Sequence, residues 1–236
     1  MYRLLSIVFL FVTTVFSSEY YAKLEPIQSY QIKSAVSGKV ESVNDKMEGK
    51  IVPSNTTLVK IDKKLNLIDL KSSQDKLKIT EEIIAIEKAN YKKLLKISTK
   101  SDFEKDTQKV KVLNLESQRN DLITAVETLK DLISNKTLNE SNVYVDKIYI
   151  KEGDYVTPGT LLYDKSDLSY GKLEFYIPIN KAKEILNKEL YLDGKKEGKI
   201  EKVYKVADST HISSYKVKVL VKNPITFSKL VKIELK

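Results

Sequence analysis

The sequence has no cysteine and no tryptophan, a single histidine, and only seven glycines and five prolines in 236 residues. Without cysteine, the chain can form neither a disulfide framework nor a thiolate metal site, and it offers no thiol nucleophile. Because His211 is the one histidine, histidine-rich metal sites and imidazole proton shuttles are disfavoured as well. We therefore expect no catalytic residue, no metal site and no cofactor, and a chain that is not an enzyme.

The proportions of hydrophobic residues, 42%, and of charged residues, 31%, are typical of a folded protein. Residues 1–18 have one positive charge at Arg3, an apolar run and small residues at the end, which is typical of a signal peptide cleaved after Ser17. An uncleaved anchor is the alternative, but the apolar run is shorter than the about 20 residues that a spanning helix needs. We expect an exported chain.

One phrase occurs twice, as "MEGKIVPSNTTLVK" from residue 47 and as "KEGDYVTPGTLLYD" from residue 151. Glycines mark the expected turns at Gly49, Gly153 and Gly159. Around both copies, period-2 alternation and frequent turn residues predict short strands. The constant spacing indicates an internal repeat, whose halves, residues 19–62 and 138–168, close into one sandwich domain.

Residues 63–137, between the two copies, contain neither Gly nor Pro and predict helix throughout. A break is expected at residues 98–102, where Ser101 and Glu104 fit a capping box. Apolar residues recur every three or four positions on both sides of this break, as in a two-helix coiled coil. The predicted seam positions are Ile79, Ile83, Ile86, Asn90, Leu94 and Ile97 in the first helix, and Leu122, Val126, Leu129 and Ile133 in the second.

Residues 169–236 again alternate like strands and predict a small antiparallel β-barrel, which the early segment "YAKLEPIQ" could complete. This region has 15 Lys against 8 acidic residues and therefore holds most of the net charge of +9. An exported basic domain could make peripheral contact with anionic lipid headgroups or with an acidic partner.

The order of these segments resembles that of the HlyD-type membrane fusion proteins, the periplasmic adaptor subunits of tripartite efflux pumps and secretion systems. The resemblance is carried by "AVSGKVESVNDKMEGKIVPSNTTLVKID" and "VDKIYIKEGDYVTPGTLLYD" on either side of the helical stretch. It implies an α+β, mostly β fold: a lipoyl-like barrel-sandwich hybrid interrupted by a long α-helical coiled-coil hairpin and followed by a small antiparallel β-barrel.

The same resemblance implies a function in transmembrane transport. It predicts a periplasmic protein associated with the inner membrane, bound to an inner-membrane RND or ABC transporter and to a TolC-like outer-membrane channel, and self-associated, commonly as a hexamer. In adaptors that meet such a channel, the hairpin tip carries an Arg, a Leu and a Ser. Here Leu94 and Ser101 stand at the last two positions, and Asn90 replaces the Arg.

Other interpretations follow from single features. The lipoyl-like halves suggest a cofactor carrier with Lys46, Lys63 or Lys64 as the attachment residue. The long helical insert, however, replaces the tight turn that would present such a lysine. The helical stripes alone fit an exported coiled-coil scaffolding or surface protein without a transport role. Because the lysines are dispersed among acidic residues, the net charge does not indicate nucleic-acid binding, and His211 is expected in a loop or at a strand edge of the barrel.

Overall fold

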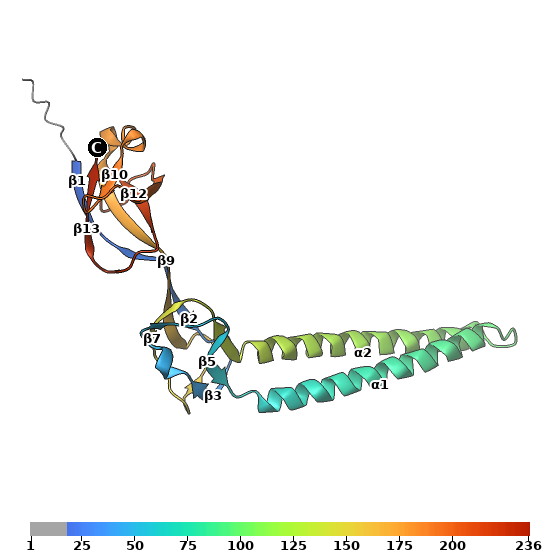
Figure 1. The fold of residues 1–236 in the computed structure, drawn as a ribbon. Helices are drawn as coiled ribbons and strands as arrows, with labels where there is room; N and C mark the ends of the chain where they lie inside the picture. Colours follow the sequence, from blue (N-terminus) through green and yellow to red (C-terminus); the bar gives the residue numbers. More distant parts are fainter. Residues whose placement is uncertain (1–17) are drawn as a thin grey trace, which may run out of the picture. The chain divides into compact units, whose positions relative to one another are not determined.

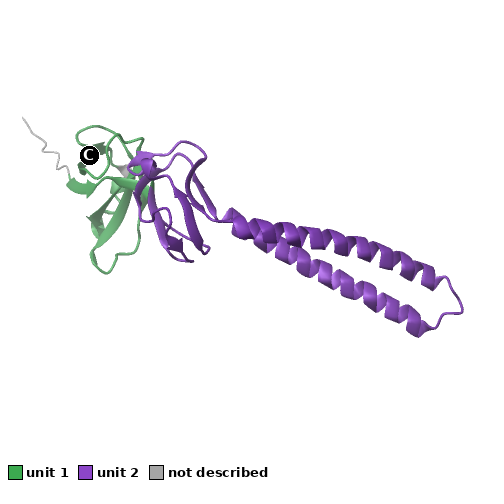
Figure 2. Cartoon of the chain, turned by 90° about the horizontal axis from the view of Figure 1, so that it is seen from below, with its two compact units in different colours: residues 1–30, 166–236 green, residues 31–165 purple. Residues whose placement is uncertain are grey.

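The computed structural model describes residues 18–236, so the predicted signal peptide lies outside the described residues except for its last position. The chain divides into two compact units (Figure 2). Unit 1 contains residues up to 30 and residues 166–236, and unit 2 contains residues 31–165. The prediction of a mostly-β chain with two long helices is confirmed.

Unit 2 is a small β-domain from which a helical hairpin extends (Figures 1 and 2). Its strands are β3 (Gly38–Val43), β4 (Lys50–Ile51), β5 (Thr56–Ile61), β6 (Thr137–Glu140), β7 (Tyr144–Ile148) and β8 (Tyr155–Val156). One sheet has the order β6-β5-β3-β8, and β4 pairs with β7. A short 3₁₀ turn spans Asp45–Met47.

In unit 2, the two halves of the repeat pair with each other reciprocally. The turn of the first copy reaches the second, where the Gly49 amide donates to the Val145 carbonyl at 2.8 Å. The turn of the second copy reaches the first, where the Gly153 amide donates to the Val40 carbonyl at 3.0 Å. Equivalent apolar residues of both copies lie in one core and are at most 1% exposed: Val40, Val52, Leu58, Val145, Val156 and Leu162. The two halves therefore form one β-domain, although residues 63–137 lie between them in the sequence.

The hairpin consists of α1 (Lys64–Leu95) and α2 (Asp102–Ser134). Figures 1 and 2 both show the two helices side by side and antiparallel. Cross-helix ion pairs fix their register, with Glu87 and Lys111 at 2.7 Å and Glu81 and Arg119 at 2.9 Å. At the root, the buried Lys136 ammonium donates to the Asp62 carbonyl at 2.7 Å, which joins the end of the second helix to the entry of the first.

The predicted seam of the first helix is largely wrong. Of its six positions only Leu94 is half-buried against the partner helix, whereas Ile79, Ile86 and Ile97 are among the exposed large side chains. The positions that do face α2 include Leu77, Thr80, Ile84 and Glu87. In α2 the predicted positions Leu122, Val126, Leu129 and Ile133 are all buried or half-buried. The error has a physical cause: α1 carries two stripes one residue apart, about 100° around the helix. In the middle of α1 the more apolar of the two, with Ile79, Ile83 and Ile86, faces away from α2.

Unit 1 is built from strands contributed by both ends of the chain. They are β1 (Ser18–Lys23), β10 (Leu190–Leu192), β11 (Lys199–Val203), β12 (Ser214–Lys222) and β13 (Leu230–Leu235). β2 (Glu25–Lys33) and β9 (Leu161–Pro178) each begin in one unit and end in the other. β1 pairs along its whole length with β13, so the early segment does join the C-terminal strands.

The core of unit 1 contains Phe175, Val219 and Ile233, each at most 3% exposed. Two 3₁₀ turns, Ile179–Lys181 and Ile185–Asn187, follow β9. Among residues 18–236, neither helix has the length and apolar character needed to cross a membrane.

Candidate partner-binding site at the hairpin tip

The tip of the hairpin is a short, internally hydrogen-bonded turn between α1 and α2. The Ser101 hydroxyl accepts from the Glu104 amide at 3.3 Å, and a Glu104 carboxylate oxygen accepts from the Ser101 amide at 3.0 Å. This is the capping box that the sequence predicted. Lys100 forms an ion pair with the same carboxylate at 2.8 Å. The lysine and the Ser101 amide together lower the pKa of Glu104, so the cap is fully ionised at neutral pH.

The three residues predicted to bind a partner have different environments. Asn90 is exposed, one turn of α1 before the tip, and Leu94 is half-buried on the side that faces α2. Ser101 is exposed, but its hydroxyl is already engaged in the cap. Of the three, Asn90 is exposed and lies outside the cap, and its side chain hydrogen-bonds to that of Glu87. Partner contact by all three stays a prediction.

Exposed apolar residues at the tip escaped the sequence-based selection. Phe103 is 80% exposed, and Leu95 and Ile97 are also large exposed side chains. Phe103 is the second residue of α2, directly after the cap, and its side chain faces solvent. An aromatic residue at the second position of a helix, outside the seam repeat, is the signal that could have identified it.

The tip is also cationic. Within the described part of the chain, Lys92, Lys93 and Lys96 are exposed and form no ion pair, whereas Lys105 pairs with Asp102 at 3.3 Å. Lys92, Lys93 and Lys96 are close in sequence to the exposed Leu95 and Ile97 at the end of α1. The arrangement suits a partner that offers an apolar groove with acidic or carbonyl groups at its rim.

The turn glycines predicted from the repeat all have backbone conformations that favour glycine. Gly49, Gly153 and Gly159 have φ values of 72°, 93° and 91°. Asn55, at the position equivalent to Gly159 in the first copy, also has a positive φ of 56°. Asparagine tolerates this region better than other side chains, so the first copy keeps the turn although it lacks the glycine.

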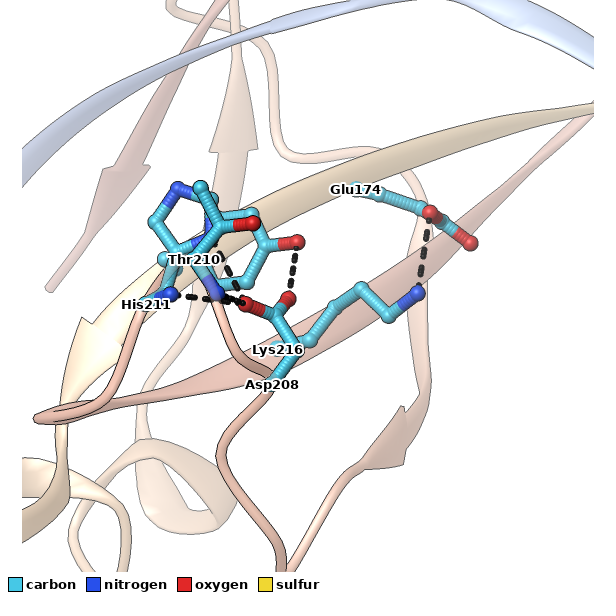
Figure 3. Close-up of polar contacts among 6 residues, drawn as sticks. Glu174, Asp208, Thr210, His211 and Lys216 are labelled. Carbon is cyan, nitrogen blue, oxygen red and sulfur yellow. Dashed lines mark hydrogen bonds and ion pairs between the residues drawn. The ribbon is translucent and has the colours of Figure 1, made fainter.

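His211 lies in a loop of unit 1 and belongs to a polar cluster (Figure 3). The Asp208 carboxylate accepts from the Tyr176 hydroxyl at 2.7 Å and from the backbone amides of Thr210 and His211. The His211 ring stacks on Tyr176 with 3.5 Å between centroids. The hydroxyl and the amides lower the pKa of Asp208 to about 2. The cluster orders the loop before β12, since every one of its bonds is internal.

The lysines considered for cofactor attachment are not in a tight presenting turn. Lys63 directly precedes α1, and its ammonium donates to the Thr137 hydroxyl at 3.1 Å. Lys64 is the first residue of α1, and Lys46 lies in a 3₁₀ turn. Lys63 therefore has a structural contact at the root of the hairpin.

No protein-family model and no curated protein matches the sequence. Solved structures do match. The membrane fusion protein Spr0693 from Streptococcus pneumoniae R6 is similar over 93% of this chain and 99% of its own, with a TM-score of 0.71 and 13% identity. The chain has the fold of a membrane fusion protein.

Two further structures agree with this fold. A MacA-MexA chimera that contains the α-hairpin domain of Pseudomonas aeruginosa MexA matches 94% of this chain and 81% of its own, with a TM-score of 0.65 and 18% identity. A candidate efflux transporter from Bacteroides eggerthii DSM 20697 matches 93% of this chain and 68% of its own, with a TM-score of 0.64 and 13% identity. At these identities the likeness describes the fold of the membrane fusion proteins.

Proposed function

We propose that the chain is a periplasmic adaptor of HlyD type, which links an inner-membrane RND or ABC transporter to a TolC-like outer-membrane channel. The observation that carries the proposal is the reciprocal pairing of Gly49 with Val145 and of Gly153 with Val40, at the root of a long two-helix hairpin. This pairing turns two distant segments into one base for the hairpin. The match to Spr0693 over nearly all of both chains supports the same role.

The hairpin suits an adaptor because it gives reach without requiring a large core. Its 32-residue first helix spans roughly 50 Å at 1.5 Å per residue. Cross-helix pairs such as Glu87 with Lys111 hold the two helices in register along this length. The tip then presents Asn90, Phe103 and unpaired lysines far from the β-domain. In this role the chain binds and aligns its partners and catalyses no reaction.

The basic unit 1 is the proposed contact with the transporter and the inner membrane. Its ordered loop between β11 and β12 exposes two apolar residues, Val206 at 81% and Ile212 at 79%. The Asp208 cluster fixes this loop, so little conformational entropy is lost when a partner binds it. The signal sequence at residues 1–18 would bring the chain across the inner membrane, and self-association, as a hexamer, would align several hairpins on one channel.

Site-specific photo-crosslinking in cells tests this function. A photoreactive amino acid in place of Phe103 is expected to capture a TolC-like outer-membrane channel, identified by mass spectrometry. The same amino acid in place of Ile212 is expected to capture an inner-membrane RND or ABC transporter. Leu67 is the matched control, because it is 47% exposed but lies at the root of the hairpin. If neither the channel nor the transporter is captured, the exported scaffolding protein is the better interpretation.

A further inference from the structure

Unit 1 contains a cavity to which the proposed adaptor role gives no task. Its volume is about 410 Å³, within the range of roughly 300–1,000 Å³ that is usual for small-molecule sites. Its walls come from both sheets of unit 1, with β10 and β13 of one sheet and β9 and β12 of the other. The turn after β10 and the loop between β12 and β13 form its rim. We call it the unit 1 cavity.

The floor of the unit 1 cavity is apolar. It consists of core side chains that are at most 8% exposed: Leu24, Leu173, Leu192, Val221 and Val231. Ile225 stands at the rim and is 99% exposed, so its side chain is free to cover a ligand. A floor of this kind favours a hydrocarbon chain, because contact removes apolar area of both partners from water.

The loop between β12 and β13 is held at both ends. Near its end, the Ser228 amide donates to the Leu24 carbonyl at 2.7 Å, and the Leu24 amide donates to the Lys229 carbonyl at 2.9 Å. At its start, Pro224 packs over Gly171, where an added Cβ would lie 3.1 Å from the Pro224 Cγ. The wall of the cavity is therefore formed before a ligand binds, and little conformational entropy is lost on binding.

The rim of the cavity carries more positive than negative charge. Lys229 pairs with Asp193 at 3.0 Å, so these two charges compensate each other. Lys195, Lys222 and Glu197 also line the cavity, and none of them forms an ion pair with another residue of the described range 18–236. Two lysines and one glutamate leave a charge of +1 at the rim, which favours an anionic group.

We propose that the unit 1 cavity binds a single-chain amphiphile with an anionic head group, such as a fatty acid or a monoalkyl phosphate. The hydrocarbon chain lies on the apolar floor under Ile225, and the carboxylate or phosphate lies at the rim with Lys195 and Lys222. A small anion alone would leave the floor in water, and an alkyl cation would meet like charge at the rim. The inference goes beyond the proposed function, which assigns no small ligand to unit 1.

Isothermal titration calorimetry of the full chain with dodecanoate, below its critical micelle concentration, tests the site. The expected result is one saturable site per chain for dodecanoate or for dodecyl phosphate, and the tighter of the two identifies the head group. Acetate, which has the head group without the chain, and dodecyltrimethylammonium, which has the chain with a cationic head, should not bind. Absence of saturable binding by both anionic amphiphiles would overturn the proposal. Equally tight binding of acetate or of dodecyltrimethylammonium would overturn it as well.

Two sets of variants at exposed positions, where the fold does not depend on the side chain, locate the ligand. Ile225→Asn should weaken dodecanoate binding about tenfold, as expected when the contact of about two methylene groups is lost. Its control Leu186→Asn, at a 68% exposed residue of unit 1 outside the cavity, should not change binding. Lys195→Gln and Lys222→Gln should each weaken binding about two- to fivefold, whereas the control Lys183→Gln should not. Equal effects of the variants and their controls would overturn the assignment of the site.

Methyl NMR of the full chain gives a second readout that does not depend on a substitution. Dodecanoate should shift the methyl signals of Leu173, Val221 and Val231 and leave those of Val40 and Val52, in the core of unit 2, unchanged. Shifts confined to unit 2, or spread equally over both units, would overturn the site. Capture of a channel and a transporter by photo-crosslinking concerns only the adaptor function, so the two proposals fail independently.

Discussion

The role of Ser101 at the hairpin tip can be decided by a series of substitutions at that one position. Its hydroxyl accepts from the Glu104 amide at 3.3 Å in a complete capping box. Replacing such a cap by alanine costs about 1 kcal/mol, whereas Asn is as good a cap as Ser. We therefore expect Ser101→Ala to loosen the first turn of α2 and Ser101→Asn to preserve it. The exposed Lys100 pair contributes little beyond this, because solvent screens it.

Amide hydrogen exchange measures the effect at the residue concerned. A loss of about 1 kcal/mol corresponds to about a fivefold change in a local opening equilibrium, so the Glu104 amide should exchange about five times faster in Ser101→Ala. Ser101→Asn should match the native chain. Unchanged exchange in Ser101→Ala would refute capping as the role of Ser101. If Ser101→Asn keeps native exchange but loses the Phe103 crosslink to the channel, the hydroxyl itself contacts the partner.

Three further changes test the ionic contacts of the two units. Glu140 accepts from Lys165 through both carboxylate oxygens at 2.7 Å, and its side chain is 10% exposed. Glu140→Gln should therefore lower the free energy of unfolding in urea by about 3–5 kcal/mol. In the control Glu127→Gln, the Glu127 side chain is 64% exposed and pairs with Lys130, and the loss should be less than about 0.5 kcal/mol. Burial and the Glu140 carboxylate raise the pKa of Tyr163 above its usual 10.0. The protonated Tyr163 hydroxyl therefore stabilises the fold below pH 10, and this stability should be lost as the pH rises further. In Tyr163→Phe, the free energy of unfolding should depend less on pH in this alkaline range. The pKa of Asp208 is lowered from 3.8 to about 2, so its loop should loosen as pH falls from about 4 to 2, and Asp208→Asn should show no such transition by hydrogen exchange.

Much of unit 2 could be predicted from the sequence because its strongest signals are local. A glycine that needs a positive φ, as at Gly49 and Gly153, limits the residue choice at a turn whatever surrounds it. The capping box of Ser101 and Glu104 is likewise formed within four residues. Two copies with the same turn chemistry therefore identified the repeat, and the reciprocal pairing follows from their similarity.

The phase of the first helix could not be predicted, because it depends on α2. A stripe of isoleucines and a mixed stripe one residue later give the same period, and periodicity alone favours the more apolar one. Glu87 faces the seam because Gln108 and Lys111 bind its carboxylate from α2, at 2.6 and 2.7 Å. Phe103 was missed for a related reason, since it belongs to no stripe. Both errors concern features that a single helix does not encode. The phase of α1 depends on contacts from α2, and the exposure of Phe103 fits the proposed contact with a partner protein.

The central claim is that residues on either side of the hairpin pair with each other in one β-domain. Lys39 of β3 lies opposite Tyr155 of β8, and both side chains are exposed. Directly opposite Cα atoms in an antiparallel pair are about 4.5–5.5 Å apart, which suits a disulfide. In the otherwise cysteine-free chain, Lys39→Cys with Tyr155→Cys should therefore oxidise within one molecule and raise its stability by about 4–5 kcal/mol for a loop of this length.

Lys39→Cys with Lys147→Cys is the matched control, because Lys147 is exposed on β7, which pairs with β4. Peptide mapping under non-reducing conditions, after oxidation of dilute protein, reads out both pairs. The account predicts a rapid intramolecular disulfide between positions 39 and 155 and none between positions 39 and 147. Equal oxidation of the two pairs, or disulfides only between molecules, would contradict it.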